Sequence, residues 1–111
     1  MNISSIAKEL ANEMINTKEY HIMQTKKNKL FSNVQIGKSA KIYRSKQFKI
    51  INSDLSPDKK QKMMINLTKE HMKLLNSTEM KEYMRSIDDF QKQVFNLFSS
   101  LNKEINKIVN G

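Results

Sequence analysis

The stretch NSTEMKEYMRSIDDFQKQVFNLFSSLNKEI (Asn76–Ile105) begins with a helix-start signal and continues as an uninterrupted amphipathic pattern. Asn76 is expected to cap a helix, and Glu79 stands three residues later, where a capping box places its acidic residue. The apolar residues that follow recur at spacings of three and four, which is typical of one helix face. The pattern continues to about Val109, so it predicts a C-terminal helix of about 30 residues and roughly 45 Å.

A helix of this length predicts self-association. A compact domain of about 100 residues has a radius of gyration near 13 Å, so one helix of roughly 45 Å overshoots it. Either the other helices lie along the whole apolar stripe, or a second copy of the chain covers part of it, and we favour the second copy. We expect a homodimer or a larger helical assembly, and we assign the following residues to its core or oligomer interface: Tyr83, Ile87, Phe90, Val94, Leu97, Phe98, Leu101 and Ile105.

The rest of the chain also predicts helices. Amphipathic segments cover about 4–16, 17–31, 32–50 and 57–75, and two glycines and one proline leave little turn chemistry for strands. Capping pairs are expected at Asn16 with Glu19 and at Ser32 with Gln35, and Ser56 followed by Pro57 marks the fourth start. We predict an all-α single domain over residues 1–111. Its roughly five helices comprise a short N-terminal pair, a long middle helix and a C-terminal hairpin ending in the long helix, assembled as an oligomeric bundle.

Composition excludes several classes of protein. The chain has no cysteine, which removes disulfides, thiolate metal sites and cysteine catalysis. The N-terminus lacks the basic and apolar regions of a signal peptide, and no stretch approaches the roughly 18 apolar residues of a membrane span. We therefore expect a soluble cytoplasmic protein with no membrane association.

Three short patterns that could suggest chemistry are better explained as helix surface or core. Gly37-Lys38-Ser39 matches the end of a P-loop, but Ser32 stands where that motif needs its first glycine, so we expect the triplet on a solvated helix face. Asp88 and Asp89 are neighbours on a helix, so their carboxylates diverge and are expected to be solvated. His21 and His71 have no metal-ligand spacing, and His71 is expected to be packed and hydrogen-bonded. We predict no catalytic site, no metal site and no cofactor.

Five methionines gather around the expected C-terminal hairpin. Methionine fills irregular gaps in a core and also suits adaptable binding surfaces. We favour ordinary core positions for Met63, Met64, Met72, Met80 and Met84.

The positive charge is concentrated in the middle of the chain. Residues 18–49 contain eight lysines and Arg44 against Glu19 alone, a net charge of +8 out of +9 for the whole chain. Clustered cations can bind phosphates, and Phe31 or Phe48 could stack on bases, whereas Tyr43 is expected in the core. Because lysine dominates over arginine, base-specific recognition is disfavoured. We favour a solvated or partner-facing surface over direct nucleic-acid binding for these residues: Lys26, Lys27, Lys29, Lys38, Lys41, Arg44, Lys46 and Lys49.

The chain resembles the YlbF/YmcA family of small bacterial regulators, which includes YheA-type proteins. IAKELANEMINTKEY (residues 6–20) resembles the family's first helix and the start of its second, and LFSNVQIGKSAKIY (residues 30–43) resembles the turn into its middle helix. Ser77 departs from the pattern, since the family usually has proline there. The closing pattern matches at Asn76, Tyr83, Phe90, Leu97, Leu101, Asn102 and Ile105.

This resemblance implies a helical, oligomeric, non-catalytic regulator that acts through protein–protein contacts in Gram-positive bacteria. The family acts in competence, sporulation and biofilm control, and some members assist ribonuclease Y-dependent mRNA maturation. Our first hypothesis is therefore a regulatory adaptor with a protein partner. The alternatives are a nucleic-acid-binding helical protein that uses the Lys-rich segment 18–49, and a structural subunit of a helical assembly.

Overall fold

The computed structural model describes residues 2–111 and folds them into helices joined by short turns. These residues contain no strand, so the predicted all-α fold is confirmed. The long C-terminal helix is also confirmed, with 33 residues that span about 50 Å at about 1.5 Å per residue. The helices are α1 (Ile3–Ile15), α2 (Lys18–Ser32), α3 (Val34–Ile51), α4 (Pro57–Glu70), α5 (Met72–Leu75) and α6 (Thr78–Asn110).

The chain divides into two compact units. The central unit, residues 27–83, contains the end of α2, all of α3, α4 and α5, and the start of α6. The terminal unit, residues 2–26 and 84–111, contains α1, the start of α2 and the rest of α6. The expectation of one domain over residues 1–111 stays a prediction.

The start of α6 is set by a single hydroxyl group. Ser77 Oγ donates to the carbonyl oxygen of Leu74 at 2.6 Å and accepts from the backbone N–H of Met80 at 3.2 Å. It therefore closes α5 and opens α6 at the same time. The prediction that Asn76 is the N-cap is wrong, because Asn76 is the C-cap of α5. Ser77, which departs from the resembled pattern, is therefore the capping residue itself.

At the starts of α2 and α3, the capping residue is also one position later than predicted. The Thr17 hydroxyl accepts from the third residue of α2 at 3.2 Å and donates to a carbonyl in the last turn of α1 at 2.7 Å. Asn33, and not Ser32, caps α3, while Ser32 is the last residue of α2. Each junction holds two adjacent cap-forming residues, and the first of them ends the preceding helix. The capping boxes expected at Asn16 and Ser32 are therefore wrong by one position.

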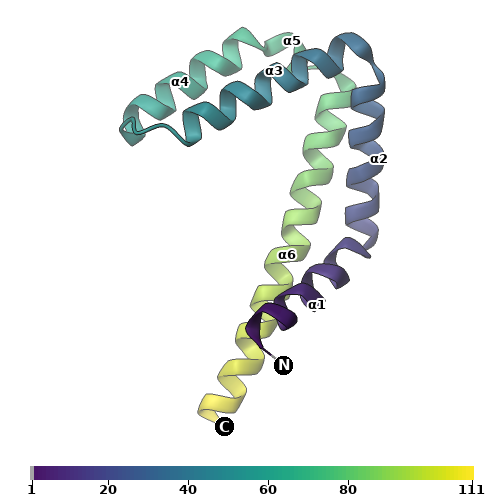
Figure 1. The fold of residues 1–111 in the computed structure, drawn as a ribbon, viewed down its shortest axis with the longest axis vertical. Helices are drawn as coiled ribbons and strands as arrows, with labels where there is room; N and C mark the ends of the chain where they lie inside the picture. Colours follow the sequence, from purple (N-terminus) through teal and green to yellow (C-terminus); the bar gives the residue numbers. More distant parts are fainter. Residues whose placement is uncertain (1) are drawn as a thin grey trace. The chain divides into compact units, whose positions relative to one another are not determined.

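In the central unit, α3 and α4 lie side by side and are joined by one short turn (Figure 1). The predicted start of α4 is confirmed, since the Ser56 hydroxyl accepts from the N–H of Lys59 at 3.3 Å and Pro57 is the first helical residue. Lys60 Nζ donates to the carbonyl oxygen of Ile51 at 2.9 Å. This bond ties the first turn of α4 to the last residue of α3.

His71 interrupts the helix expected over 57–75, which is why residues 2–111 form six helices instead of five. Its φ of −114° and ψ of 26° lie outside the helical region, and its N–H donates to the carbonyls of both Leu67 and Thr68. Its imidazole meets the ring of Tyr43 edge-on, with centroids 5.5 Å apart. Neither glycine nor proline marks this break, so composition gave no signal for it.

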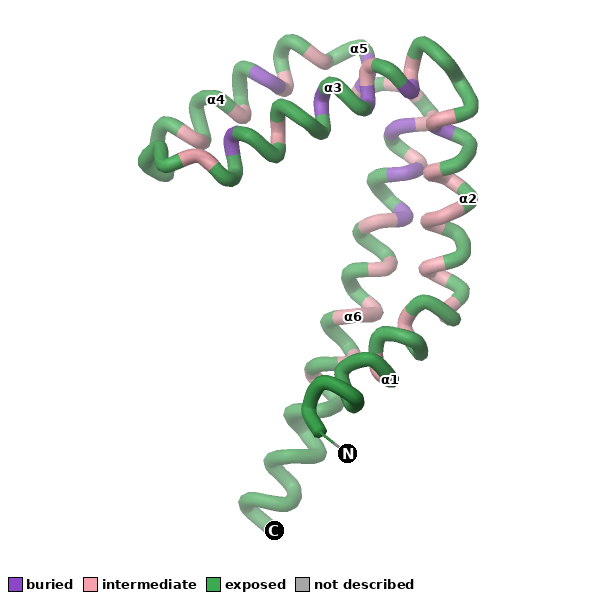
Figure 2. The backbone as a smooth tube through the Cα atoms, viewed as in Figure 1, coloured by how far each residue is buried: buried purple, intermediate pink, exposed green. Residues whose placement is uncertain are grey.

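Among residues 2–111, the buried apolar side chains all lie in the central unit (Figure 2). They come from the end of α2, from α3, α4 and α5, and from the start of α6, so the central unit has a core of its own. The terminal unit has no buried apolar side chain, and α1 has no buried residue of any kind. The core consists of Leu30, Ala40, Tyr43, Ile50, Leu67, Leu74, Met80 and Tyr83.

Candidate functional site

The two units differ in charge as well as in burial. The central unit carries thirteen Lys and Arg side chains against five Asp and Glu, a net charge of +8. The terminal unit carries seven against six, a net charge of +1. The positive field therefore belongs to the unit that contains the core, and it includes lysines of α4 that lie outside the predicted basic segment.

Among the predicted basic residues, Lys29 and Lys46 each form an ion pair. Lys29 Nζ lies 3.6 Å from Glu82 Oε2 and joins the end of α2 to the start of α6. Lys46 Nζ lies 3.6 Å from Glu70 Oε2 and joins α3 to α4. All four side chains are at least one-third exposed, so each pair contributes little stability but partly neutralises its lysine.

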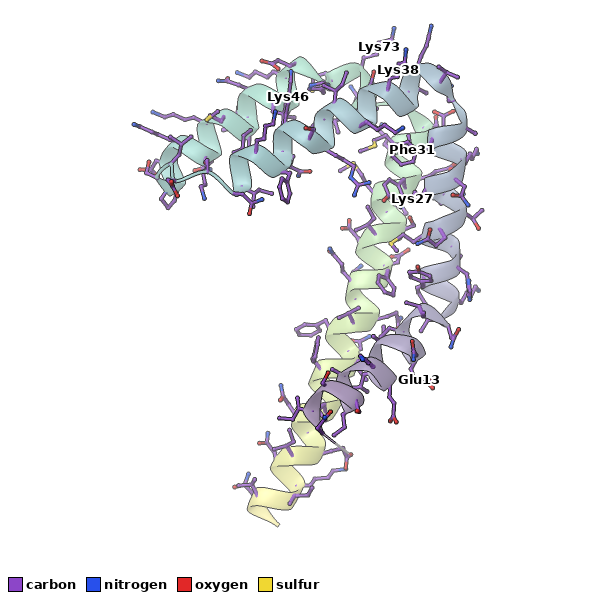
Figure 3. All side chains as sticks on the ribbon, viewed as in Figure 1. Glu13, Lys27, Phe31, Lys38, Lys46 and Lys73 are labelled. Carbon is purple, nitrogen blue, oxygen red and sulfur yellow. The ribbon has the colours of Figure 1, made fainter. Side chains whose placement is uncertain are left out.

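The basic residues of α3 face different directions around the helix. Lys41 Nζ lies 5.9 Å from the centroid of the Phe31 ring, in cation–π contact. Lys46 stands five positions further on, which at about 100° per residue is about 140° around the helix. Figure 3 labels Lys38 and Lys46 on α3. The other predicted residues are also dispersed: Lys38, Arg44 and Lys49 are exposed, Lys27 is half-buried, and Lys26 belongs to the terminal unit.

The apolar stripe of α6 is covered at its start and uncovered toward its end (Figure 2). Tyr83 is 7% exposed, whereas Phe98 is 54% exposed, Leu101 43% and Ile105 46%. The chain by itself thus leaves the last turns of the predicted stripe open to solvent. The residues between are half-buried: Ile87, Phe90, Val94 and Leu97.

Within the terminal unit, the start of α2 covers part of α6. The rings of Tyr20 and Phe90 lie 5.5 Å apart between centroids, with their planes at 60°. The amphipathic face of α1 is less covered, because Ile3, Ile6 and Ile15 are all exposed. Both ends of the chain therefore contribute exposed apolar side chains to the same unit.

Gly37-Lys38-Ser39 lies inside α3, so the helical interpretation of this triplet is confirmed. Gly37 itself is buried, however, and is not part of a solvated face as predicted. A Cβ at this position would lie 3.4 Å from the backbone of Phe31, which follows from the tight turn between α2 and α3. The glycine serves close helix packing and does not form a phosphate-binding loop.

The histidines and the aspartate pair are placed largely as expected. Asp88 and Asp89 are exposed on α6, and His21 is exposed beside Tyr20. His71 is packed against Tyr43, but its Nε2 is buried with no hydrogen-bond partner in the described chain, so the expected hydrogen bonding is wrong at that atom. Over residues 2–111, no three His, Asp or Glu side chains gather as a metal site would require.

The prediction that the methionine cluster is ordinary core is wrong for most of its members. Met80 is buried, but Met63, Met72 and Met84 are between 42% and 49% exposed. The spacing of the methionines is that of a helix, as predicted. Spacing alone does not show which face of the helix packs against another helix. Met63 takes part in a surface feature that sequence reasoning missed, a groove between α3 and α4.

The structure is that of a small all-α protein. Its accessible features are exposed apolar helix faces and the basic surface of the central unit. None of the helices over residues 2–111 is long and apolar enough to cross a membrane. The chain belongs to the YlbF/YmcA family, because the family model described as "Control of competence regulator ComK, YlbF/YmcA" matches residues 3–110. No curated protein and no solved structure matches the chain significantly. The family is described by regulation and not by an enzymatic reaction, which is consistent with a regulatory role exerted on protein partners.

Proposed function

We propose that this protein is a non-catalytic regulatory adaptor that self-associates through the terminal unit and engages a protein partner through the central unit. One observation carries the proposal: in the described chain, the buried apolar side chains lie in residues 27–83, while α1 has none and the end of α6 leaves Phe98, Leu101 and Ile105 exposed. A helical segment without a core is marginal by itself and gains its stability from packing. A second copy would supply that packing.

The size of the uncovered stripe supports self-association. Fully burying a Leu, Ile or Phe side chain contributes about 1.5–3 kcal/mol. Phe98, Leu101 and Ile105 are each about half exposed, so covering them would contribute about 2–5 kcal/mol per chain before the entropic cost of association. In a two-fold dimer the same patch occurs twice, which doubles this contribution.

Charge supports the choice of the terminal unit as the self-associating one. With a net charge of +1, two terminal units meet without strong repulsion. Two central units at +8 each would repel one another unless counter-ions or an acidic partner intervened. The central unit is therefore better suited to a partner of different composition.

Within this role we propose control of competence, sporulation or biofilm formation in a Gram-positive bacterium. Competence control is the role in the family's own description, which supports the first of these. Assistance to ribonuclease Y-dependent mRNA maturation is a more specific form of the same proposal, and it rests on the family resemblance of the sequence.

A second candidate function is direct nucleic-acid binding, which the charge of the central unit favours. Phosphate contacts by lysine give affinity that falls steeply with salt. Against it, Lys29 and Lys46 are already paired with glutamates and the cations of α3 do not form one row. We therefore place this function second.

Affinity capture with nuclease treatment tests the adaptor proposal against nucleic-acid binding. The tagged protein and a Leu101→Asp variant would be used as baits in a lysate of a Gram-positive bacterium. We expect the same specific proteins to be recovered with and without nuclease, together with a second copy of the chain only for the unmodified bait. If nuclease removes every association and RNA affinity falls steeply with salt, the second function is correct and the adaptor proposal is wrong.

A further inference from the structure

A groove of about 390 Å³ runs between α3 and α4 in the central unit. The two lysines that line it belong to the last turns of α3, and its other wall is one face of α4. The lining residues are Lys46, Lys49, Ile50, Met63, Asn66, Leu67 and Glu70.

The floor of the groove is apolar and continuous with the core. Ile50 and Leu67 are 7% and 4% exposed, and both belong to the buried set of the central unit. Met63 stands beside them at 43% exposure. An exposed methionine next to a rigid apolar floor is adaptable, because its unbranched side chain can repack around different ligands. The groove therefore offers a preformed site for a few apolar side chains.

The rim of the groove is mostly cationic. Lys49 is exposed and forms no ion pair with any described residue. Lys46 forms the 3.6 Å pair with Glu70, the only acidic residue in the lining. Lys59 lies one helical turn before Met63 and therefore on the same face of α4. A ligand that carries carboxylates meets unpaired positive charge on both sides of the apolar floor.

We propose that this groove binds an acidic amphipathic helix of a partner protein. Apolar side chains at helical spacing would lie on Ile50, Met63 and Leu67, and flanking carboxylates would face Lys49 and Lys59. This is the helix-in-groove mode of recognition, with charge setting the orientation. The inference rests on the proposed adaptor function and gives the chemistry of its partner.

The groove fits an acidic helix better than a nucleic acid or a second copy of this chain. A sugar-phosphate backbone gains nothing from the apolar floor, and no aromatic side chain lines the groove for base stacking. A second central unit carries the same net charge of +8 and would be repelled. Charge complementarity therefore selects a net acidic partner.

Selection from a random peptide library displayed on phage tests the chemistry of the ligand directly. The full-length protein is the target, and a Lys49→Glu variant is used for counter-selection. We expect the enriched peptides to be net acidic, with apolar residues spaced by three and four. Enrichment of basic peptides, of neutral peptides without this spacing, or of none above background contradicts the proposal.

Fluorescence polarisation with the strongest acidic peptide then tests the location of the site. Lys49→Glu and Met63→Gln are each expected to weaken binding at least tenfold, while circular dichroism shows unchanged helix content. Lys81→Glu is the matched control, because it makes the same charge reversal on an exposed lysine of α6 in the central unit. Equal weakening by the control means that net charge alone drives binding, and the groove is then excluded.

A single-stranded RNA probe and a mass measurement separate the other outcomes. One outcome is that RNA is the only probe that binds the unmodified protein, with lower affinity for Lys49→Glu and no binding of any peptide. In that case the surface binds polyanions and the proposal is wrong. The molar mass of the same samples reports self-association independently. An oligomer without peptide binding overturns the groove proposal alone, and a monomer that binds peptide overturns only the self-association part of the proposed function.

Discussion

The ring of Tyr20 lies against the ring of Phe90, with centroids 5.5 Å apart and planes inclined at 60°, and this contact joins α2 to α6 in the terminal unit. Both side chains are only half-buried. The contact is therefore among the better packed points of a unit whose apolar residues are otherwise largely exposed.

Phe90→Ala is expected to lower the free energy of unfolding by about 1–2 kcal/mol, less than the roughly 3–5 kcal/mol of a fully buried Phe.

A double-mutant cycle with Tyr20→Leu and Phe90→Leu isolates the ring contact, which we expect to contribute about 0.5–1.5 kcal/mol. Urea denaturation followed by circular dichroism gives the four values. His21→Ala is the control, since the exposed His21 makes only an edge contact 6.0 Å from Tyr20. A coupling energy of zero contradicts the contact.

Ser77→Ala is expected to cost about 1 kcal/mol of stability, because one hydroxyl serves both the Leu74 carbonyl and the Met80 N–H. Asn76→Ala is expected to cost less than about 0.5 kcal/mol, as for most exposed surface changes. Thermal unfolding of the two variants side by side measures the difference. If Asn76→Ala proves the more costly of the two, Asn76 is the cap after all and the hydroxyl arrangement is not what starts α6.

These junctions show what local sequence could and could not predict. The helices themselves followed from apolar spacing and from Ser56 and Pro57, since both signals depend on neighbouring residues only. The exact caps did not, because each junction contains two suitable residues and the length of the preceding helix decides between them. The break at His71 carries neither glycine nor proline, and the contact of its ring with Tyr43 of another helix is one that no local pattern reveals.

The candidate surfaces were predictable to a similar degree. The α6 stripe was recognised from its spacing, and its half-buried start and open end became visible only in the fold. The basic segment was recognised from composition, but composition could not show that Lys29 and Lys46 have acidic neighbours. The groove at Met63 was missed, because it requires the pairing of α3 with α4.

Gly37→Ala is expected to raise stability by up to about 1 kcal/mol, because alanine is the better helix former and its Cβ would meet the Phe31 backbone at 3.4 Å, an ordinary contact distance. Gly37→Val is expected to lower stability by about 1–3 kcal/mol, since its extra methyl groups have no room beside Phe31. The midpoint of urea unfolding checks both signs. Stabilisation by valine would show that α2 and α3 are not closely packed at this point.

His71→Phe is expected to leave stability unchanged or to raise it by about 1 kcal/mol. Phenylalanine keeps the edge contact with Tyr43 and removes the buried Nε2 that has no hydrogen-bond partner. His71→Ala loses the ring and is expected to cost about 1–2 kcal/mol, since the site is only partly buried. Calorimetric unfolding of both variants provides the comparison. Equal losses in the two would mean that the imidazole nitrogen makes a bond that matters in solution.

The central claim is that the exposed end of the α6 stripe is covered by a second copy of the chain, and the molar mass in solution tests it most directly. Light scattering after size-exclusion chromatography at micromolar concentration is expected to give at least twice the 13.0 kDa of one chain. Phe98→Asp is expected to reduce the mass to that of one chain, because it places a charge in the stripe. Ser100→Asp, on the opposite face of the same helix, is expected to leave the mass unchanged. A monodisperse 13.0 kDa species for the unmodified protein would contradict the claim.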